Sequence, residues 1–355
     1  SWAFMAVFMS SRICVCRLLI AFYCMRSGIV TWVGIILTLD DAVPSAADRF
    51  RRIGRIAGIT AITASVAAAG VTAWAVRECH QFQLRRLELP LLPPGTLRGK
   101  REFRLLHISD LHMVPGQRAK QEWVAGLDQL QPDLVVNTGD NLSDLKAVPA
   151  TLRALGPLMR RPGLFVFGSN DYYAPTVVNP LSYVVGKKRK ASRVELPWRG
   201  MRAAFIEHGW QDATHRRLEF KVGSVRIAAT GVDDPHHDLD DYGQVSGAPN
   251  AEADLRLALV HSPEPRVLAQ FAADGYQLAL CGHTHGGQIC LPGGKTLVTN
   301  CGIDRVRAWG LHEFDGMMLH VSNGLGTSKF APVRLFCRPS ATLISLVEKP
   351  DLARE

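Results

Sequence analysis

The chain has 355 residues, of which 47% are hydrophobic and 21% charged, a composition that excludes a disordered or fibrous protein. Its net charge of +9 suits a partner that carries phosphate or an anionic membrane surface, but charge alone does not distinguish the two. The eight cysteines include no C-x-x-C pair, which argues against a zinc ribbon. Cys290 and Cys301 could form a disulfide if this part of the chain is exported.

The N-terminal region is apolar in two parts. Residues 1–48 are interrupted by arginines and form an extension to which we assign no function. Residues 56–76 carry no charge, and as a helix they would be about 31 Å long, which matches the hydrocarbon core of a bilayer. A transmembrane anchor, a cleaved signal peptide and a buried alanine-rich helix remain open here. We expect a single-pass anchor or signal segment over 49–86, with the domain that follows it on the outer face of the cell membrane.

A proline- and glycine-rich stretch at 87–100 predicts a linker, so the main domain is expected over 101–349. Apolar runs predict strands at 103–109, 133–138 and 164–167, and amphipathic patterns predict helices at 119–130 and 152–159. This alternation is typical of a parallel sheet covered by helices.

Further strands are expected at 226–230, 255–260, 278–281, 297–300, 317–322 and 343–346. Several are separated by short turns, which implies antiparallel pairing, so a mixed two-sheet sandwich with outer helices fits best. The basic run at 187–190 is either a solvated surface loop or a flap over an anionic substrate.

Polar side chains that can bind metal follow five of the predicted strands. In chain order they are Asp110 and His112, Asp140, Ser169 and Asn170, His261, and finally His283 and His285. Ligands of parallel sheets bind beyond the carboxyl ends of the strands, so these side chains are expected at one rim. Residues two apart in an extended segment point the same way, so His283 and His285 can face one site.

Other polar residues have plainer interpretations. His107 lies within a strand and is expected in the core, and the pair at 236–237 is expected in a solvated acidic loop rather than at a metal. Asn141 and Gln288 adjoin candidate ligands and could orient them or a phosphate, and Asp233 could belong to the outer shell.

The motif order resembles that of the calcineurin-like metallophosphoesterases, which is D-x-H, G-D-x, G-N-H-D/E, an isolated His and G-H-x-H. The resemblance spans residues 103–346, and segments 231–235, 321–326 and 332–334 look like the branch of membrane-tethered or exported bacterial enzymes. It implies a four-layer αββα sandwich of two mixed β-sheets flanked by helices. It also implies hydrolysis of a phosphate ester with two divalent metal ions.

Carried over to this chain, the resemblance implies a set of protein ligands for each of the two metal ions. Asp110, His112 and His285 would hold the first metal, His261 and His283 the second, and Asp140 would bridge both. The two ions would clamp a phosphate while a shared hydroxide attacks phosphorus. Mixed oxygen and nitrogen ligands suit Mn, Fe or Zn better than Mg or Ca.

The chain departs from the family pattern at Ser169-Asn170, where the family has Asn and then His. Either Ser169 takes the position of the metal-binding Asn and Asn170 that of the His, or a one-residue shift makes Asn170 the amide ligand. We prefer the shift, because a carboxamide oxygen is the better ligand. In both registers the usual imidazole is missing, which affects leaving-group assistance.

The expected substrate is a phosphomonoester, a phosphodiester or a pyrophosphate-linked compound, such as a lipid or nucleotide-linked precursor. The membrane segment and the resemblance motivate the lipid. A nuclease is favoured only by the basic charge, and the chain lacks the interleaved aromatic residues of a single-strand platform, so nucleic acid is not the expected partner. A metal-bearing binding protein with weak turnover is the third interpretation.

Overall fold

The structure, a computed structural model, describes residues 45–176 and 194–350 together with five short strands nearer the N-terminus. These strands are β1 (Met5–Phe8), β2 (Leu19–Phe22), β3 (Met25–Arg26), β4 (Ile29–Val30) and β5 (Val33–Ile35). The chain divides into two units, residues 1–68 and 69–355. The basic run predicted at 187–190 lies outside the described residues.

The apolar run predicted at 56–76 lies within one long helix, α1 (Ala46–Glu78). Its segment Phe50–Glu78 is long and apolar enough to cross a membrane, with a mean hydropathy of 1.7. Large apolar side chains along it, such as Ile53, Ile62 and Val66, are each more than half exposed. A core helix would bury such side chains, so the exposure fits an anchor or signal helix better than a buried one.

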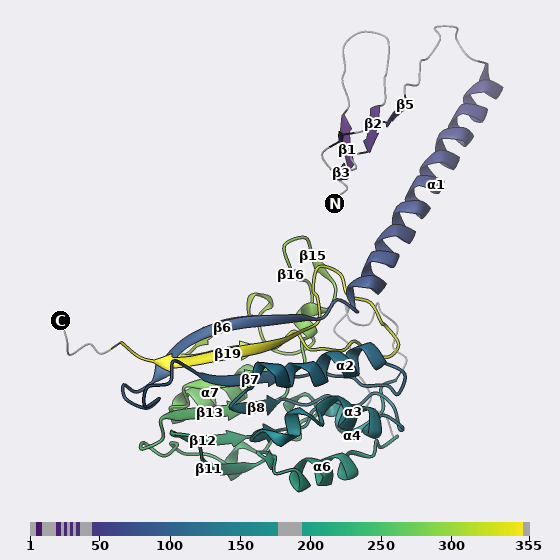
Figure 1. The fold of residues 1–355 in the computed structure, drawn as a ribbon. Coiled ribbons are helices and arrows are strands. Elements are labelled where there is room, and N and C mark those ends of the chain that lie inside the picture. Colours follow the sequence, from purple (N-terminus) through teal and green to yellow (C-terminus); the bar gives the residue numbers. More distant parts are fainter. Residues whose placement is uncertain are drawn as a thin grey trace. The chain divides into compact units, whose positions relative to one another are not determined.

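The first of two six-stranded sheets has the order β10-β9-β8-β7-β19-β6 (Figure 1). Its strands are β6 (Gln83–Leu92), β7 (Phe103–Ile108), β8 (Leu134–Asn137), β9 (Gly163–Phe165), β10 (Gln211–Asp212) and β19 (Ser340–Glu348). Strands β7 to β10 are parallel, and β19 runs antiparallel to β7 and parallel to β6.

The second sheet has the order β11-β12-β13-β14-β18-β17, with β12, β13, β14 and β18 parallel and both edges antiparallel. Its strands are β11 (Arg216–Val222), β12 (Val225–Gly231), β13 (Leu255–Leu259), β14 (Leu278–Cys281), β17 (Gly310–Phe314) and β18 (Met317–Val321). A two-residue pair, β15 (Cys290–Leu291) with β16 (Lys295–Thr296), forms a separate hairpin.

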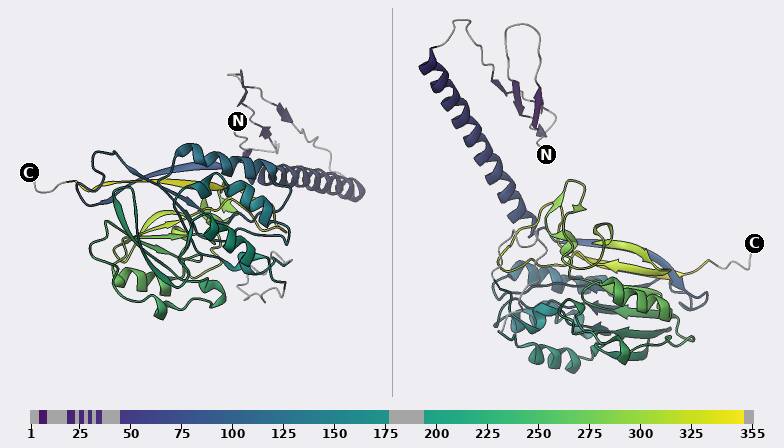
Figure 2. Two further views of the ribbon diagram at one scale, coloured as in Figure 1. Left: turned by 60° about the horizontal axis from the view of Figure 1, so that its bottom comes forward. Right: turned by 180° about the vertical axis from the view of Figure 1, so that it is seen from behind.

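Helices cover the outer face of each sheet (Figures 1 and 2). The first sheet carries α2 (Arg118–Gly126), α3 (Val148–Leu155) and α6 (Trp198–Glu207), and the second carries α7 (Pro265–Asp274). Short 3-10 helices add η1 (Leu127–Leu130), η2 (Leu158–Arg160), η4 (Tyr242–Gln244) and η6 (Arg305–Arg307).

Strand alternation explains the three cores. Leu105 of β7 points into the core between the sheets, whereas its neighbour Leu106 packs under the helices of the first sheet. Leu257 and Ala258 of β13 divide in the same way between the inter-sheet core and the α7 side. The resulting helix, sheet, sheet and helix layers confirm the predicted αββα sandwich.

Two local predictions need correction. Residues 87–92 of the predicted linker belong to β6, because Leu89 and Leu92 are buried in the inter-sheet core. Pro90 signalled a linker, but β6 is an edge strand, where proline is tolerated. The strand predicted at 297–300 is wrong: Leu297 is exposed, and pairing is confined to β16 just before it.

Candidate metal centre

The predicted ligands follow the carboxyl ends of β7, β8, β9, β13 and β14. Asp110 and His112 follow β7, Asp140 follows β8, Asn170 lies in α4 (Ser169–Tyr172) after β9, His261 follows β13, and His283 and His285 follow β14. Except for Asn170 and the partly exposed His285, these side chains are buried. The strand ends therefore place polar groups from both sheets in one enclosed cluster.

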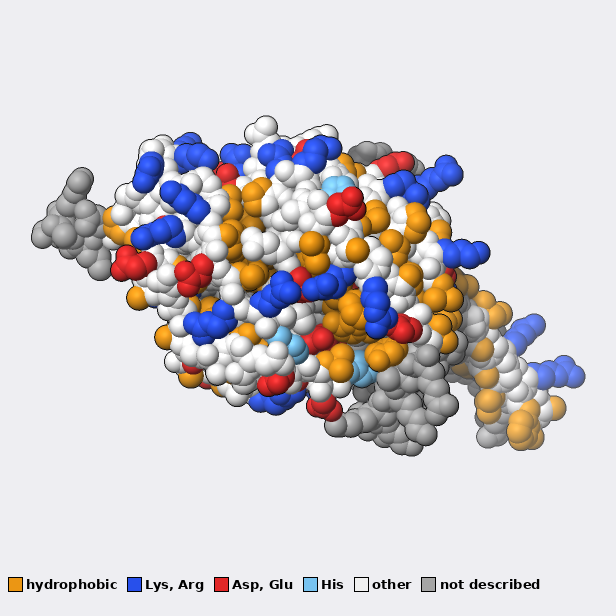
Figure 3. Space-filling view, turned by 90° about the horizontal axis from the view of Figure 1, so that it is seen from below, with side chains coloured by type: hydrophobic (Ala, Val, Ile, Leu, Met, Phe, Trp, Pro, Cys, Tyr) orange, Lys and Arg blue, Asp and Glu red, His pale blue; other side chains and the backbone are white. Residues whose placement is uncertain are grey.

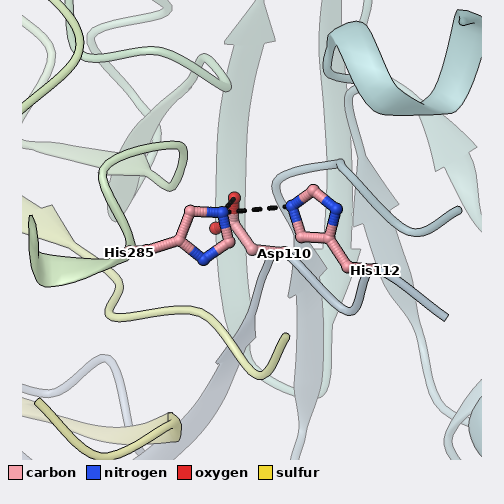
Figure 4. A group of neighbouring side chains, drawn as sticks. All are labelled: Asp110, His112 and His285. Atoms are coloured by element: carbon pink, nitrogen blue, oxygen red, sulfur yellow. Dashed lines mark hydrogen bonds and ion pairs between the residues drawn. The ribbon is translucent and has the colours of Figure 1, made fainter. Parts of the chain in front are cut away.

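Asp110, His112 and His285 form the first group that could hold a metal ion (Figure 4). The Nε2 atoms of His112 and His285 are 3.1 Å apart, and His285 Nε2 is 3.6 Å from Asp110 Oδ1. Ser143 Oγ lies 3.0 Å from His112 Nδ1 and orients that ring. Three ligand atoms thus converge from two loops on one point.

Asp110, Asp140 and His261 form the second group, which shares Asp110 with the first. Asp140 Oδ2 lies 3.3 Å from His261 Nε2 and 3.4 Å from His112 Nε2, which belongs to the first group. One carboxylate oxygen therefore lies between imidazoles of the two groups, where a bridging ligand would be.

His261 provides a test of whether a cation fits here. Its Nδ1 is 2.7 Å from the carbonyl oxygen of Thr138, so Nδ1 carries hydrogen and donates it. Its Nε2 is buried without a hydrogen-bond partner and faces Asp140 and Asp110. Burial would lower the pKa of His261, but these carboxylates outweigh it and hold the pKa well above its usual value. The surroundings favour a positive charge between Nε2 and the carboxylates, and a metal ion would supply it.

The other imidazoles are held in the form that binds metal. Burial lowers the pKa of His112 to about 4, and it is also the main cause that lowers the pKa of His283 and His285 well below the usual value. Burial raises the pKa of Asp110 to about 6, because a buried carboxylate loses its hydration. Neutral imidazole is the metal-binding form, so the burial of these rings suits coordination.

His283 is adjacent to both groups but outside the closest sets. Its backbone N–H donates to both oxygens of Asp110, at 3.0 and 3.1 Å, and its ring centroid lies 5.3 Å from that of His261. Its Nε2 is 3.3 Å from the carbonyl oxygen of Asn300, which leaves Nδ1 as the atom available for a metal.

Asn170 lies against the carboxylate of Asp140. Its side-chain Nδ2 is 2.7 Å from Asp140 Oδ2, and its backbone N–H donates to Oδ1 at 2.8 Å. Ser169 is held differently, through a backbone N–H that donates to Asp234 at 2.9 Å. The carboxamide of Asn170 is therefore the group from this turn that contacts the cluster.

Most of the candidate ligands have a left-handed backbone conformation. Five of the seven candidate ligands have positive φ angles: Asp110 (51°), His112 (41°), Asp140 (55°), His283 (71°) and His285 (51°). Residues other than glycine avoid this region, and such outliers concentrate at functional sites. Gly168 allows the close approach, because a Cβ there would collide with the Asp140 carboxylate and the His261 ring.

Two buried carboxylates that the sequence did not single out organise the loops. Asp171 accepts hydrogen bonds from the backbone N–H groups of Asp140 (2.8 Å), Asn141 (2.7 Å) and Gly168 (3.0 Å), and so joins the β8 and β9 loops. Asp234 holds Ser169. Asp171 occupies the acidic position of the third motif, G-N-H-D/E. That position could have identified it from the sequence.

The predicted outer residues have different positions. Asn141 is buried and accepts from Asn137 at 2.8 Å. Asp233 accepts from Tyr172 at 2.9 Å, so it supports α4, and Gln288 donates to the carbonyl of Ala331 at 3.1 Å. The predicted core residue His107 is buried beside His320 and Thr138.

His236 differs from its expected solvated position. It lies in η3 (Pro235–His237), and its ring centroid is 4.5 Å from that of His283. The segment after β12 therefore brings an imidazole to the edge of the cluster, which the local sequence alone did not indicate.

Comparisons with known proteins identify the family of this chain. The family model described as calcineurin-like phosphoesterase matches residues 103–287, which include every candidate ligand. The chain is 28% identical over 254 residues to "Phosphodiesterase YaeI" of Escherichia coli (strain K12), covering 69% of this chain and 82% of that protein. It is 26% identical over 268 residues to "Transmembrane protein with metallophosphoesterase domain" of Danio rerio, covering 71% of this chain and 54% of that protein.

Among solved structures, a dimetal phosphatase from Danio rerio is 12% identical, covers 64% of this chain and 88% of its own, and gives a TM-score of 0.36.

Proposed function

Because the chain belongs to the calcineurin-like phosphoesterase family and is a phosphoester hydrolase, we propose that it works with two divalent metal ions in this cluster. The observation that carries the proposal is the position of Asp140 Oδ2 within 3.4 Å of imidazoles in both ligand groups. A carboxylate in this position screens the repulsion between two cations. The substrate is a phosphomonoester, a phosphodiester or a pyrophosphate-linked compound.

The residues divide between the two ions as follows. Asp110, His112 and His285 would hold the first ion, His261, His283 and Asn170 would hold the second, and Asp140 would be shared by both. Bound divalent ions polarise the phosphate and make water a nucleophile at neutral pH. The chain itself positions the ligands through Thr138 and Ser143 and keeps the cluster buried. Oxygen and nitrogen donors in this mixture suit Mn, Fe or Zn.

Hydrolysis of model esters tests this proposal. Metal-free protein should be inactive, and Mn, Fe or Zn should restore cleavage of p-nitrophenyl phosphate, of its bis-ester, or of both. The ratio of the two rates would separate a monoesterase from a diesterase. Two metal ions per chain should accompany full activity in a titration followed by elemental mass spectrometry. Full cleavage in the presence of a chelator, with no metal bound, would contradict the proposal.

Membrane association supports a lipid-linked substrate. The exposed apolar helix α1 and the transmembrane relative favour a tether over the expected segment 49–86. The proposal also places the domain on the outer face. On the face shown in Figure 3, Lys and Arg side chains are spread among acidic and neutral ones. Strand β6 belongs to the first sheet, so the catalytic domain starts before residue 101, the boundary predicted from the sequence.

Fractionation tests the tether. Full-length protein should remain with the membranes after a carbonate wash at high pH, because α1 has the length and apolar character to span the bilayer. External protease should digest the domain in intact spheroplasts if it lies on the outer face. A shortened soluble product would instead identify a cleaved signal, and release of the intact chain would contradict both interpretations.

A further inference from the structure

A pair of buried cysteines lies directly behind the loop that carries His285. Cys290 is 3% exposed and Cys337 is 4% exposed. The Cys290 sulfur is 3.1 Å from the carbonyl oxygen of Gly286, and the Cys337 sulfur is 3.5 Å from the same oxygen. Both sulfurs therefore approach the same backbone oxygen. We propose that Cys290 and Cys337 form a disulfide that fixes the His285 loop to the C-terminal segment.

The backbone already holds the two cysteine segments together. Ile289 and Leu335 form a parallel bridge, in which Cys290 N–H donates to the Leu335 carbonyl at 2.9 Å and Leu335 N–H donates to that of Gln288 at 3.0 Å. A disulfide needs two β-carbons a few ångströms apart, and the approach of both sulfurs to the Gly286 oxygen brings these side chains together. Cys301, the partner that the sequence suggested for Cys290, instead lies near Cys281 and Ser262.

The side chains around Cys337 distinguish the two sulfurs. Arg334 Nη1 and Asn323 Nδ2 each lie 3.7 Å from Cys337 Sγ, so N–H donors converge on this sulfur. Arg334 is fully buried, and its nitrogens also donate to backbone carbonyls, including those of Asn323 and Gly326. We assign the first attack to Cys337, which carries these contacts, and Cys290 completes the bond.

The oxidant is a small-molecule or protein disulfide, which the outer-face orientation would provide while the chain folds. Cys337 attacks one sulfur of the oxidant and releases one thiol. Cys290 then attacks the mixed disulfide and releases the second thiol, so two electrons and two protons pass from the pair to the oxidant. The bridge does not depend on phosphoester hydrolysis.

The bridge would act on the metal centre through the turn η5 (His285–Gly287). Cys337 Sγ lies 3.2 Å from the carbonyl oxygen of His285, and a Cβ on Gly286 would collide with this sulfur. The pair therefore contacts the backbone on both sides of the His285 to Gly286 peptide bond. A bond between the two sulfurs would restrict the motion of the loop that carries His285. Residues behind a metal ligand fix its orientation in the same way.

Peptide mapping of the full-length protein in detergent micelles tests the bridge. After treatment with oxidised glutathione, remaining thiols are alkylated in denaturant, and the digest is analysed by mass spectrometry. We expect one linked peptide containing Cys290 and Cys337, lighter by two hydrogens than its two reduced parts. Cys301→Ser should keep this link, and Cys337→Ala should remove it without creating one between Cys290 and Cys301. Separate alkylation of both cysteines, or a link from Cys290 to another cysteine, would overturn the proposal.

Metal release provides the second measurement and is independent of turnover. Oxidised protein should lose metal to a chelator about tenfold more slowly than reduced protein, since supporting residues change metal affinity by about 10–100-fold. Cys290→Ser should release metal at the reduced rate whether oxidised or not, and Cys301→Ser should respond like the unmodified protein. Equal release rates from linked and reduced protein would overturn the effect on the metal loop.

Discussion

Replacing Asp140 with asparagine should lower phosphoesterase activity by about 10²–10³-fold, the range typical for losing one central electrostatic group. The substitution keeps the shape of the side chain but removes the charge that lies 3.3 Å from His261 Nε2 and 3.4 Å from His112 Nε2. A neutral amide cannot balance two dications, so metal affinity should fall together with turnover. Steady-state rates on p-nitrophenyl esters and the metal content per chain would measure the two effects.

The stability of the metal-free protein separates loss of binding from loss of folding. Burial and the nearby charge of Asp140 both raise the pKa of Asp110, so these carboxylates repel each other without a cation. Asp140 also pairs with His261 and accepts two hydrogen bonds from Asn170, so Asp140→Asn should destabilise the metal-free protein. Added metal should then stabilise the variant less than it stabilises the unmodified chain. Asp144→Asn removes a carboxylate from the same loop, paired with Lys329 at 2.7 Å, and should leave activity and metal content unchanged. Near-normal turnover of Asp140→Asn with two metals bound would show that Asp140 is not the bridge.

The strand ends explain why much of the cluster could be predicted from sequence. A buried apolar run followed by Asp, His or Gly-Asp places its polar residues at the carboxyl edge of a sheet, whatever the order of the strands. Asp110, Asp140 and His261 come together for this reason, although they lie on two different sheets. The local sequence pattern thus places each residue at the carboxyl edge of its sheet, and the packing of the two sheets brings these edges together.

Residues that depend on distant partners could not be predicted in the same way. Strand β6 was hidden by Pro90, and its pairing with β19 joins segments about 250 residues apart. Asp234 and His236 follow β12 in what resembles a solvated acidic loop, and only the packing of the second sheet brings them to Ser169 and His283. The approach of Cys290 and Cys337 to the same Gly286 oxygen was not predicted, because Ile289 pairs with Leu335, which no local spacing encodes.

The turn after β9 should affect how strongly the hydrolysis rate depends on the leaving group. General acid assistance is typically worth about 10²–10⁴-fold, and the family imidazole that can provide it is replaced here by Asn170 or lost through a shift in register. The enzyme should therefore cleave activated aryl esters far faster than alkyl esters, with a steep dependence on leaving-group pKa. Rates over a series of substituted phenyl and alkyl phosphates would measure this slope.

Two substitutions distinguish the registers. In the register that we prefer, the carboxamide oxygen of Asn170 is the metal ligand, and its Nδ2 donates to Asp140 Oδ2 at 2.7 Å. In that case Asn170→His should lower metal content and activity together. Ser169→Ala should be nearly silent, because Ser169 contacts Asp234 through its backbone N–H. If Asn170 instead occupies the general-acid position, Asn170→His should flatten the leaving-group dependence at full metal content, and Ser169→Ala should lower metal affinity. A flat dependence in the unmodified protein would contradict both registers and show that another group supplies the proton. His236, whose ring centroid lies 4.5 Å from that of His283, would then be the first residue to replace.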